Sequence, residues 1–218
     1  MRFMVAVGIL CFTVARSDAQ NADTLRTGRR PLLPRDREIA LARSAAPPTV
    51  SDSATIWVLG DTSYEVAVRG SNGNVCFVGR DWIDTITPEC FDAEGAATVL
   101  QMERMHVELL HRGRTERQAQ QAIADALRDG RLRPPRRPAL CYMMSADQWL
   151  INEQRHVEGH WHPHLMVYYP YLTSADLGSG NGGSDTALML WEGTPWSSIV
   201  IVVPRFTHSA SNTGAGAH

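Results

Sequence analysis

The sequence predicts an α+β domain with a mostly antiparallel sheet, in which an αα-hairpin is inserted between two groups of strands. Two observations predict this class. Segments rich in β-branched and aromatic residues occur in two separate runs, and two segments with apolar residues at helical spacing lie between them. Strands and helices in separate runs are typical of α+β domains rather than of alternating βαβ units.

The first nineteen residues predict an exported protein. Arg2 is followed by an apolar run over residues 3–15 and by the small-x-small cleavage pattern Ser17-Asp18-Ala19. We therefore interpret residues 1–19 as a signal peptide and expect a periplasmic or secreted protein. No later segment approaches the roughly 18–20 apolar residues that a membrane span needs. We expect a disordered leader over 20–34, one α+β domain over 35–208 and a flexible tail over 209–218.

The first group of elements begins with a helix over residues 35–45, which Pro47-Pro48 ends. Strands are predicted over residues 55–59, 64–69 and 74–78. Asn72-Gly73 tolerates positive φ and predicts a hairpin turn between the last two strands. In the middle strand Tyr64, Val66 and Val68 would share one face.

The αα-hairpin is predicted from two patterns. Residues 94–112 carry an apolar stripe at helical spacing, which includes His106 as a packed histidine, and Gly113 ends this helix. Thr115 and Gln118 form a capping box that starts the second helix, and Gly130 ends it. The remaining strands are predicted over residues 140–144, 165–169, 187–191 and 198–203.

The cysteines predict one disulfide in an oxidising compartment. Of the three cysteines that follow the predicted signal peptide, Cys76 and Cys90 close the shortest loop, so we expect them to pair. Cys141 lies in an apolar run and is interpreted as a buried thiol rather than a nucleophile.

Composition excludes several function classes. All 21 basic residues are Arg, so the chain has no amine for a Schiff base, a phosphate-loop lysine or a Ser-Lys dyad. The sequence contains no Gly-x-Ser-x-Gly and no His-Glu-x-x-His motif. A formal net charge of −2 predicts no general attraction for nucleic acid. The arginine-rich connector around residues 128–137 is interpreted as a solvated linker, with contact to anionic lipid headgroups or to a partner protein as the alternative.

A histidine cluster is the densest group of metal-ligating residues. In an extended segment His160, His162 and His164 share one side, and three imidazoles together are typical of a site for a divalent transition metal. Glu158 or His208 would complete the ligand set. The spacing resembles the His-x-His motif of cupins, although the Glu of that motif is missing. The alternative is a polar entry loop before a strand, which Pro163 interrupts.

Three motifs together resemble a family of exported bacterial proteins without an assigned activity. They are Asn72-Gly73-x-x-Cys76, Pro88-Glu89-Cys90-Phe91-Asp92-Ala93-Glu94-Gly95 and Pro163-His164-x-Met166-x-Tyr168-x-Pro170-x-Leu172-Thr173-x-Ala175-Asp176-x-Gly178. The resemblance implies export and one compact domain, and it assigns no catalytic residue. Our leading hypothesis is a non-catalytic binding or envelope-associated protein. The alternative is a metal-dependent enzyme, cupin-like or hydrolytic, built on the histidine cluster.

Overall fold

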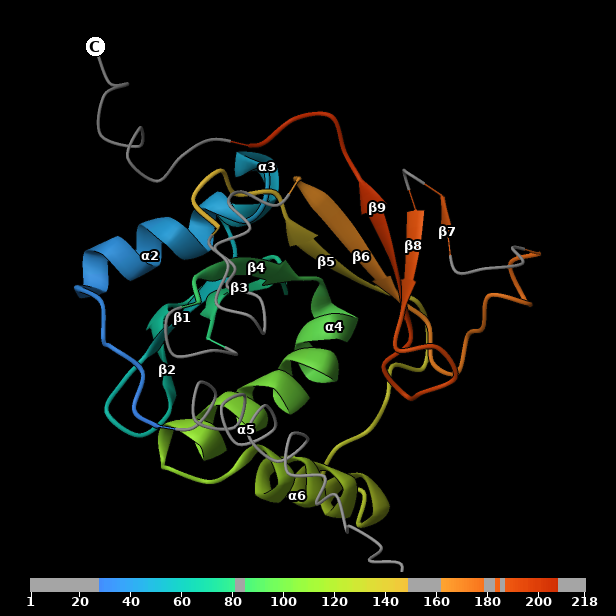
Figure 1. The fold of residues 1–218 in the computed structure, drawn as a ribbon. Coiled ribbons are helices and arrows are strands. Elements are labelled where there is room, and N and C mark those ends of the chain that lie inside the picture. The colour runs from blue at the N-terminus through green and yellow to red at the C-terminus, as the bar shows by residue number, and fades with distance from the viewer. Residues whose placement is uncertain (1–27, 81–84, 149–161, 179–182, 185–186, 208–218) are drawn as a thin grey trace, which may run out of the picture.

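The structure is a computed structural model that describes residues 28–80, 85–148, 162–178, 183–184 and 187–207 (Figure 1). Within these residues the strands form one sheet with the order β2-β1-β3-β4-β5-β6-β9-β8-β7. Strands β1 and β3 are parallel, and the other neighbouring pairs are antiparallel. The α+β class is confirmed, with a sheet that is mixed but mostly antiparallel.

The element bounds lie close to those predicted for most segments. The helices are α2 (Arg35–Ser44), α3 (Pro48–Ser51), α4 (Ala93–Ala97), α5 (Val99–His111) and α6 (Glu116–Arg128). The strands are β1 (Thr55–Leu59), β2 (Tyr64–Val68), β3 (Val75–Gly79), β4 (Thr87–Phe91), β5 (Ala139–Met143), β6 (His164–Tyr168), β7 (Gly183–Ser184), β8 (Ala187–Leu190) and β9 (Ser198–Val202). The sequence pattern predicts none of α3, β4 and the two-residue strand β7.

The prediction of a hairpin at Asn72-Gly73 is wrong, because β2 and β3 lie on opposite sides of β1. The segment between them crosses over the start of β1 and is held there by hydrogen bonds. The Asn72 side chain donates to the Val50 carbonyl at 2.7 Å, and the Ser71 amide donates to the Ser53 carbonyl at 2.8 Å. Gly73 does adopt a positive φ of 79°. A turn therefore forms at this position, but the strands before and after it, β2 and β3, do not pair with each other.

The predicted common face of Tyr64, Val66 and Val68 is also not found. The register between β1 and β2 shifts at Ile56 and Trp57, where a β-bulge interrupts the ladder. A bulge moves the residues beyond it to the other face of the sheet. As a result Tyr64 and Val68 pack in different hydrophobic clusters, one on each side of the sheet.

The helical stripe predicted over residues 94–112 is divided at Thr98 into α4 and α5. Thr98 leaves the helical conformation, with φ −132° and ψ −81°, and its hydroxyl donates to the Glu94 carbonyl at 2.6 Å. The capping box of α6 is present as predicted, with Thr115 and Gln118 satisfying each other's backbone amides. Helices α5 and α6 pack against each other, and His106 contacts both carboxylate oxygens of Glu116 at 3.0 Å.

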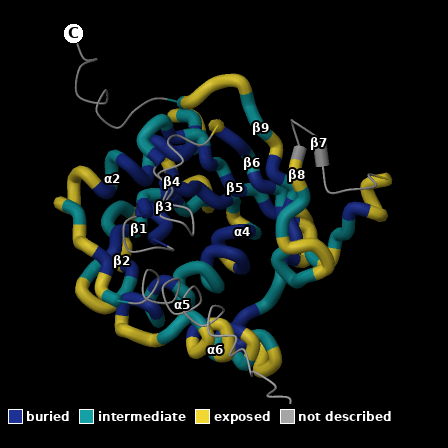
Figure 2. The backbone as a smooth tube through the Cα atoms, in the orientation of Figure 1, coloured by how far each residue is buried: buried dark blue, intermediate teal, exposed yellow. Residues whose placement is uncertain are grey.

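Two hydrophobic cores lie on opposite faces of the sheet. The α2-side core places Leu41 and Ala42 against Ile56, Cys76 and Cys90. The α5-side core is larger, and it is composed of Leu59, Tyr64, Phe77, Phe91, Ala96, Val99, Leu100, Val107, Ala139, Cys141, Met143, Met166, Tyr168 and Val200. Figure 2 shows the central strands as buried and much of α6 as exposed. The domain is therefore built around β3 and β4, which are covered on both sides.

Residues 28–34 belong to the segment whose composition predicts disorder, yet they are packed on the domain. Arg30 is 1% exposed, and its Nε donates to the Arg80 carbonyl at 3.0 Å. The Gly28 amide donates to the Leu110 carbonyl at 3.1 Å. These contacts attach the N-terminal segment to the end of β3 and to the end of α5. Local composition alone does not predict them.

Candidate functional site

The histidine cluster lies only partly within the described residues. His160, Glu158 and His208 fall outside them, whereas His162 and His164 are described. His162 is exposed just before β6, and His164 is buried as its first residue. The two described histidines therefore occupy different environments. Within the described ranges, no three His, Cys, Asp or Glu side chains gather in a metal-binding arrangement.

The ring of His164 has a defined orientation. Its Nδ1 lies 2.8 Å from the His162 carbonyl oxygen, which can only accept, so Nδ1 carries the proton. Burial lowers the pKa of His164, and the hydrogen bond to the His162 carbonyl opposes that effect. The neutral ring with a protonated Nδ1 is the tautomer that keeps the lone pair on Nε2.

The three described cysteines occupy the positions that the sequence analysis expects. Cys76 and Cys90 are directly opposite each other on β3 and β4 and form a disulfide. Cys141 is a free and fully buried thiol on β5. Burial raises the pKa of Cys141 well above its ordinary value, and the carboxylates of Glu89 and Glu103 add to this effect. A thiol with a raised pKa is a poor nucleophile at neutral pH.

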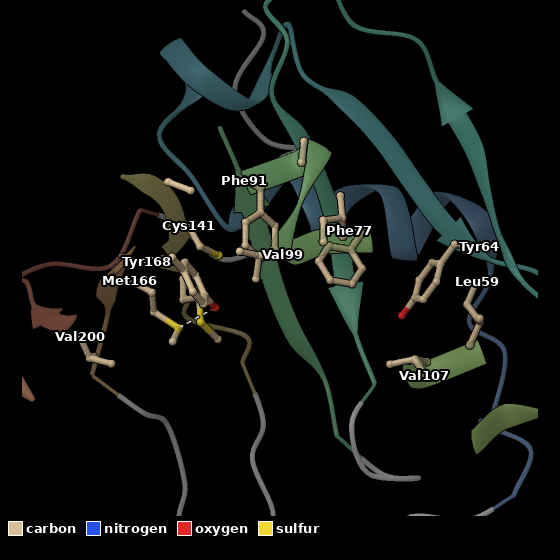
Figure 3. Close-up of a cluster of buried hydrophobic side chains, with 14 residues drawn as sticks. Leu59, Tyr64, Phe77, Phe91, Val99, Val107, Cys141, Met166, Tyr168 and Val200 are labelled. Carbon is tan, nitrogen blue, oxygen red and sulfur yellow. Dashed lines mark hydrogen bonds between the residues drawn. The ribbon is translucent and has the colours of Figure 1, made fainter. Parts of the chain in front are cut away.

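A row of aromatic rings crosses the α5-side core (Figure 3). Tyr64, Phe77, Phe91 and Tyr168 follow one another with ring centroids 5.4, 6.2 and 6.0 Å apart. Trp191 continues the row, because its ring stacks on Tyr168 at 6.5 Å with an interplanar angle of 14°. Tyr168 is 1% exposed and Trp191 is 54% exposed. The row therefore ends at the surface, in a ring that packs on Tyr168 and is about half exposed.

Trp191 lies in one of two loops that are hydrogen-bonded to each other. We call these loops, residues 169–173 and 191–197, the aromatic loop pair. The Tyr171 amide donates to the Thr194 carbonyl at 2.8 Å, and the Gly193 amide donates to the Leu172 carbonyl at 2.9 Å. Tyr169 and Tyr171 are also among the large side chains that are exposed. The loop pair thus presents three aromatic residues to solvent from one hydrogen-bonded frame.

Two of these aromatic residues adopt a strained backbone. Among the described non-glycine residues, only Tyr171 and Trp191 have positive φ, at 63° and 52°. For a bulky side chain this conformation costs about 1–3 kcal/mol. At Trp191 the cost is offset by hydrogen bonds to its carbonyl, which accepts from the Thr194 hydroxyl at 2.6 Å and from the Ser197 hydroxyl at 2.8 Å.

Carboxylates hold the neighbouring turn in place. Glu192 accepts from the Ser174 amide at 2.6 Å and from the Ser174 hydroxyl at 3.2 Å. Asp176 accepts from the Thr173 hydroxyl at 2.7 Å and from the Thr173 amide at 2.9 Å. The Thr173 hydroxyl and then its amide lower the pKa of Asp176. These acids order the loop around the exposed rings.

The arginine-rich connector between α6 and β5 is matched by acidic residues. Arg128 and Arg131 contact Asp125 and Asp129, while Arg133 and Arg137 contact Glu94. Its positive charge is thus largely compensated within the chain. The segment predicted as a solvated linker is thus attached to the domain by the ion pairs of Arg133 and Arg137 with Glu94.

Sequence reasoning missed the aromatic loop pair. The signal present in the sequence is the concentration of aromatic residues beside turn formers, in Tyr169-Pro170-Tyr171 and in Trp191-Glu192-Gly193-Thr194-Pro195-Trp196. The local pattern alone does not show that the two loops are neighbours or that Trp191 stacks on a buried ring.

In the part of the chain that the structure describes, none of the helices combines the length and the apolar character required to cross a bilayer. Comparison of the chain with protein-family models, with curated proteins and with solved structures finds no significant match.

Proposed function

We propose that the protein is an exported, non-catalytic binding domain, and that the aromatic loop pair binds the sugar rings of an envelope polysaccharide. The observation that carries the proposal is the exposed, stacked ring of Trp191 on a strained and hydrogen-bonded loop. Strained backbone concentrates at functional sites, where it positions a group before its ligand arrives.

The arrangement suits a flat ligand with an apolar face. Trp and Tyr provide large contact areas with little conformational freedom, and Tyr168 already fixes one face of Trp191. A ring that is fixed before binding loses little entropy on binding. The apolar C–H face of a sugar ring has the shape to cover the open face of Trp191.

The size of the surface favours a saccharide over a protein. A standard protein interface involves roughly 20–30 residues on each side. The aromatic loop pair presents three exposed rings, and the carboxylates next to them already accept hydrogen bonds within the loops. Such a surface provides few contacts for a protein but enough for one or two sugar rings.

The test measures how much purified mature protein pellets with insoluble peptidoglycan and with cellulose. We expect binding to at least one of them, without release of soluble sugar. Trp191→Asn and Tyr171→Asn remove the rings, and Asn tolerates positive φ, so both variants should remain folded. Each is expected to weaken binding at least about tenfold, which corresponds to about 1.4 kcal/mol.

Phe206→Ala is the matched control, because Phe206 is an exposed aromatic residue outside the loop pair. It should bind like the unmodified protein. The proposal would be contradicted if the protein pelleted with neither polymer. It would also be contradicted if Trp191→Asn bound as tightly as the unmodified protein. Release of soluble sugar would instead indicate a hydrolase.

Metal binding at the histidine cluster is the second candidate function. The observation that favours it is the hydrogen bond from His164 Nδ1 to a backbone carbonyl, because metal-ligating histidines are usually oriented in this way. Elemental analysis of protein purified from a periplasm tests it. We expect the parent protein to contain a stoichiometric amount of a transition metal and the double variant His162→Ala/His164→Gln to lose it. Substoichiometric metal in the parent protein would refute the hypothesis.

A further inference from the structure

The edge of the sheet that carries the aromatic loop pair also receives the end of the arginine-rich connector. Ala139 is opposite Tyr168, Tyr168 is opposite Ser198, and Ser198 is opposite Leu190. These four residues are each the last or the first residue of their strands, and Figure 1 shows the four strands side by side. The connector therefore enters β5 at the edge where both loops of the pair join the sheet.

Arg136 differs from the other arginines of the connector. Those four pair with aspartate or glutamate side chains of the domain. Arg136 is exposed, and in the part of the chain that the structure describes its guanidinium group makes no ion pair and no hydrogen bond. The connector thus presents one uncompensated positive charge to solvent.

The backbone at Arg136 is held in place. Its amide donates to Glu94 Oε1 at 2.9 Å, and the Glu94 side chain is only 11% exposed. Pro134-Pro135 precede Arg136 and Pro138 follows it closely, and proline fixes the φ angle of the chain. A charged side chain on a fixed backbone loses less freedom when it binds a ligand.

Arg136 is also close enough to the aromatic loop pair to contact the same ligand. Opposite residues of antiparallel strands have Cα atoms about 4.5–5.5 Å apart, which applies to Ala139 and Tyr168. The three residues from Arg136 to Ala139 span at most about 11 Å. The Cα atom of Arg136 therefore lies within about 16 Å of that of Tyr168, on whose ring Trp191 stacks.

The charges along this edge of the sheet are unequal. At the β5 end, the guanidinium groups of Arg133, Arg136 and Arg137 outnumber the carboxylate of Glu94. The one acidic residue of the aromatic loop pair, Glu192, follows β8. Strands β9 and β6 separate β8 from β5, which places the two strand ends roughly 14 Å apart. The β5 end is therefore the place for a negative group of a ligand.

We propose that Arg136 binds an acidic group, a carboxylate or a phosphate, on the polysaccharide whose sugar rings cover the aromatic loop pair. This inference rests on the proposed function and adds that the polysaccharide is anionic. The planar guanidinium group matches two oxygens of a carboxylate or phosphate and donates two parallel hydrogen bonds to them. A polysaccharide chain along this edge of the sheet places its rings on Trp191 and its acidic group beside β5.

The test compares pelleting of the mature protein with two matched pairs of insoluble polymers. One pair is cellulose and carboxylated cellulose, and the other is peptidoglycan with amidated carboxylates and untreated peptidoglycan. At an ionic strength of about 0.01 M, where charges interact over about 30 Å, the acidic member of the bound pair should bind at least about fivefold more tightly. At about 1 M salt this preference should disappear, because the charges are screened.

Arg136→Gln should abolish the preference and leave binding to the neutral polymer unchanged. The variant should remain folded, because it keeps the backbone amide that Glu94 binds. Arg131→Gln is the matched control, since it removes the same charge from an arginine that already pairs with Asp129 at 3.4 Å. It should keep the preference.

Equal binding of both members of a pair by the unmodified protein would overturn the inference, and so would a preference that Arg136→Gln retains. In both cases the proposed function stands if Trp191→Asn weakens binding to the neutral polymer. Binding that Trp191→Asn leaves unchanged would contradict the proposed function itself. Binding to phosphatidylglycerol vesicles but to neither pair of polymers, lost in Arg136→Gln, would identify a lipid headgroup as the ligand and overturn the inference.

Discussion

His111 joins three segments of the chain at the end of α5. Its Nδ1 accepts the Arg30 amide proton at 2.9 Å, and its Nε2 donates to the Asp61 carbonyl at 3.0 Å. Burial lowers the pKa of His111, the Asp61 carbonyl opposes this effect, and the positive charges of Arg29 and Arg30 lower the pKa further. A protonated ring loses its acceptor, so the Arg30 amide would be left without its partner.

Acidification should therefore destabilise the protein through His111. Because the pKa of His111 is lower in the folded state, the unfolded chain takes up the proton first. The stabilisation is fully present above the unfolded pKa near 6.5 and is lost as the pH falls through the folded pKa. Denaturant unfolding at pH 7.5 and pH 5.5 measures this loss.

The variant His111→Gln should show a smaller loss of stability between the two pH values, since it does not titrate. Part of the loss should remain because burial also lowers the pKa of His164. At pH 7.5, His111→Ala should cost about 2 kcal/mol, because it leaves a buried amide unpaired. An unchanged pH dependence in His111→Gln would contradict this assignment.

At the scale of elements, Glu94 connects the first turn of α4 to the arginine-rich connector. Its Oε1 accepts from the Arg136 amide at 2.9 Å and from Arg133 Nη1 at 3.0 Å. The Arg136 amide is the main cause that lowers the pKa of Glu94, and the guanidinium groups of Arg133 and Arg137 add to it. One carboxylate thus positions the connector before β5.

We expect Glu94→Ala to lower the free energy of unfolding by about 1–2 kcal/mol, because it removes charge-assisted hydrogen bonds from a mostly buried carboxylate. Glu65→Ala is the control. Its ion pair with Arg35 is exposed at both ends, and such pairs contribute less than about 1 kcal/mol. Equal effects of the two substitutions in denaturant unfolding would refute the role given to Glu94.

At the scale of the whole molecule, the Cys76–Cys90 disulfide links two central strands beneath α2. The cysteines are 14 residues apart, and closing a loop of about that length stabilises a domain by about 3 kcal/mol. Replacing both with Ala should lower the free energy of unfolding by at least this amount. Chemical denaturation of the purified variant measures it.

Cys141→Ala is the matched control for this loss, since it removes a small buried side chain and no crosslink. Thiol labelling provides a second readout. The native mature protein should not react, and the unfolded protein should show one thiol per chain. Recovery of a peptide that joins Cys141 to Cys76 or Cys90 would disprove the pairing.

Local signals in the sequence determined many elements of this protein. The capping box of Thr115 and Gln118 predicts the start of α6, because both partners are three residues apart and need no distant contact. The β-branched runs predict β1, β6 and β9 for a similar reason. The short separation of Cys76 and Cys90 predicts their pairing. Whether Glu158, His160 and His208 bind a metal stays a prediction, since they lie outside the described residues.

Only the tertiary structure decided how these elements are arranged. Strand β4 contains Pro88 and Glu89, both unfavourable in strands, and it forms because β3 and β5 pair on its two sides. Non-local contacts also place Arg30 in the interior and Trp191 on the ring of Tyr168. Such positions depend on residues far away in the chain, so no local pattern specifies them, and for that reason the candidate binding surface emerges only from the fold.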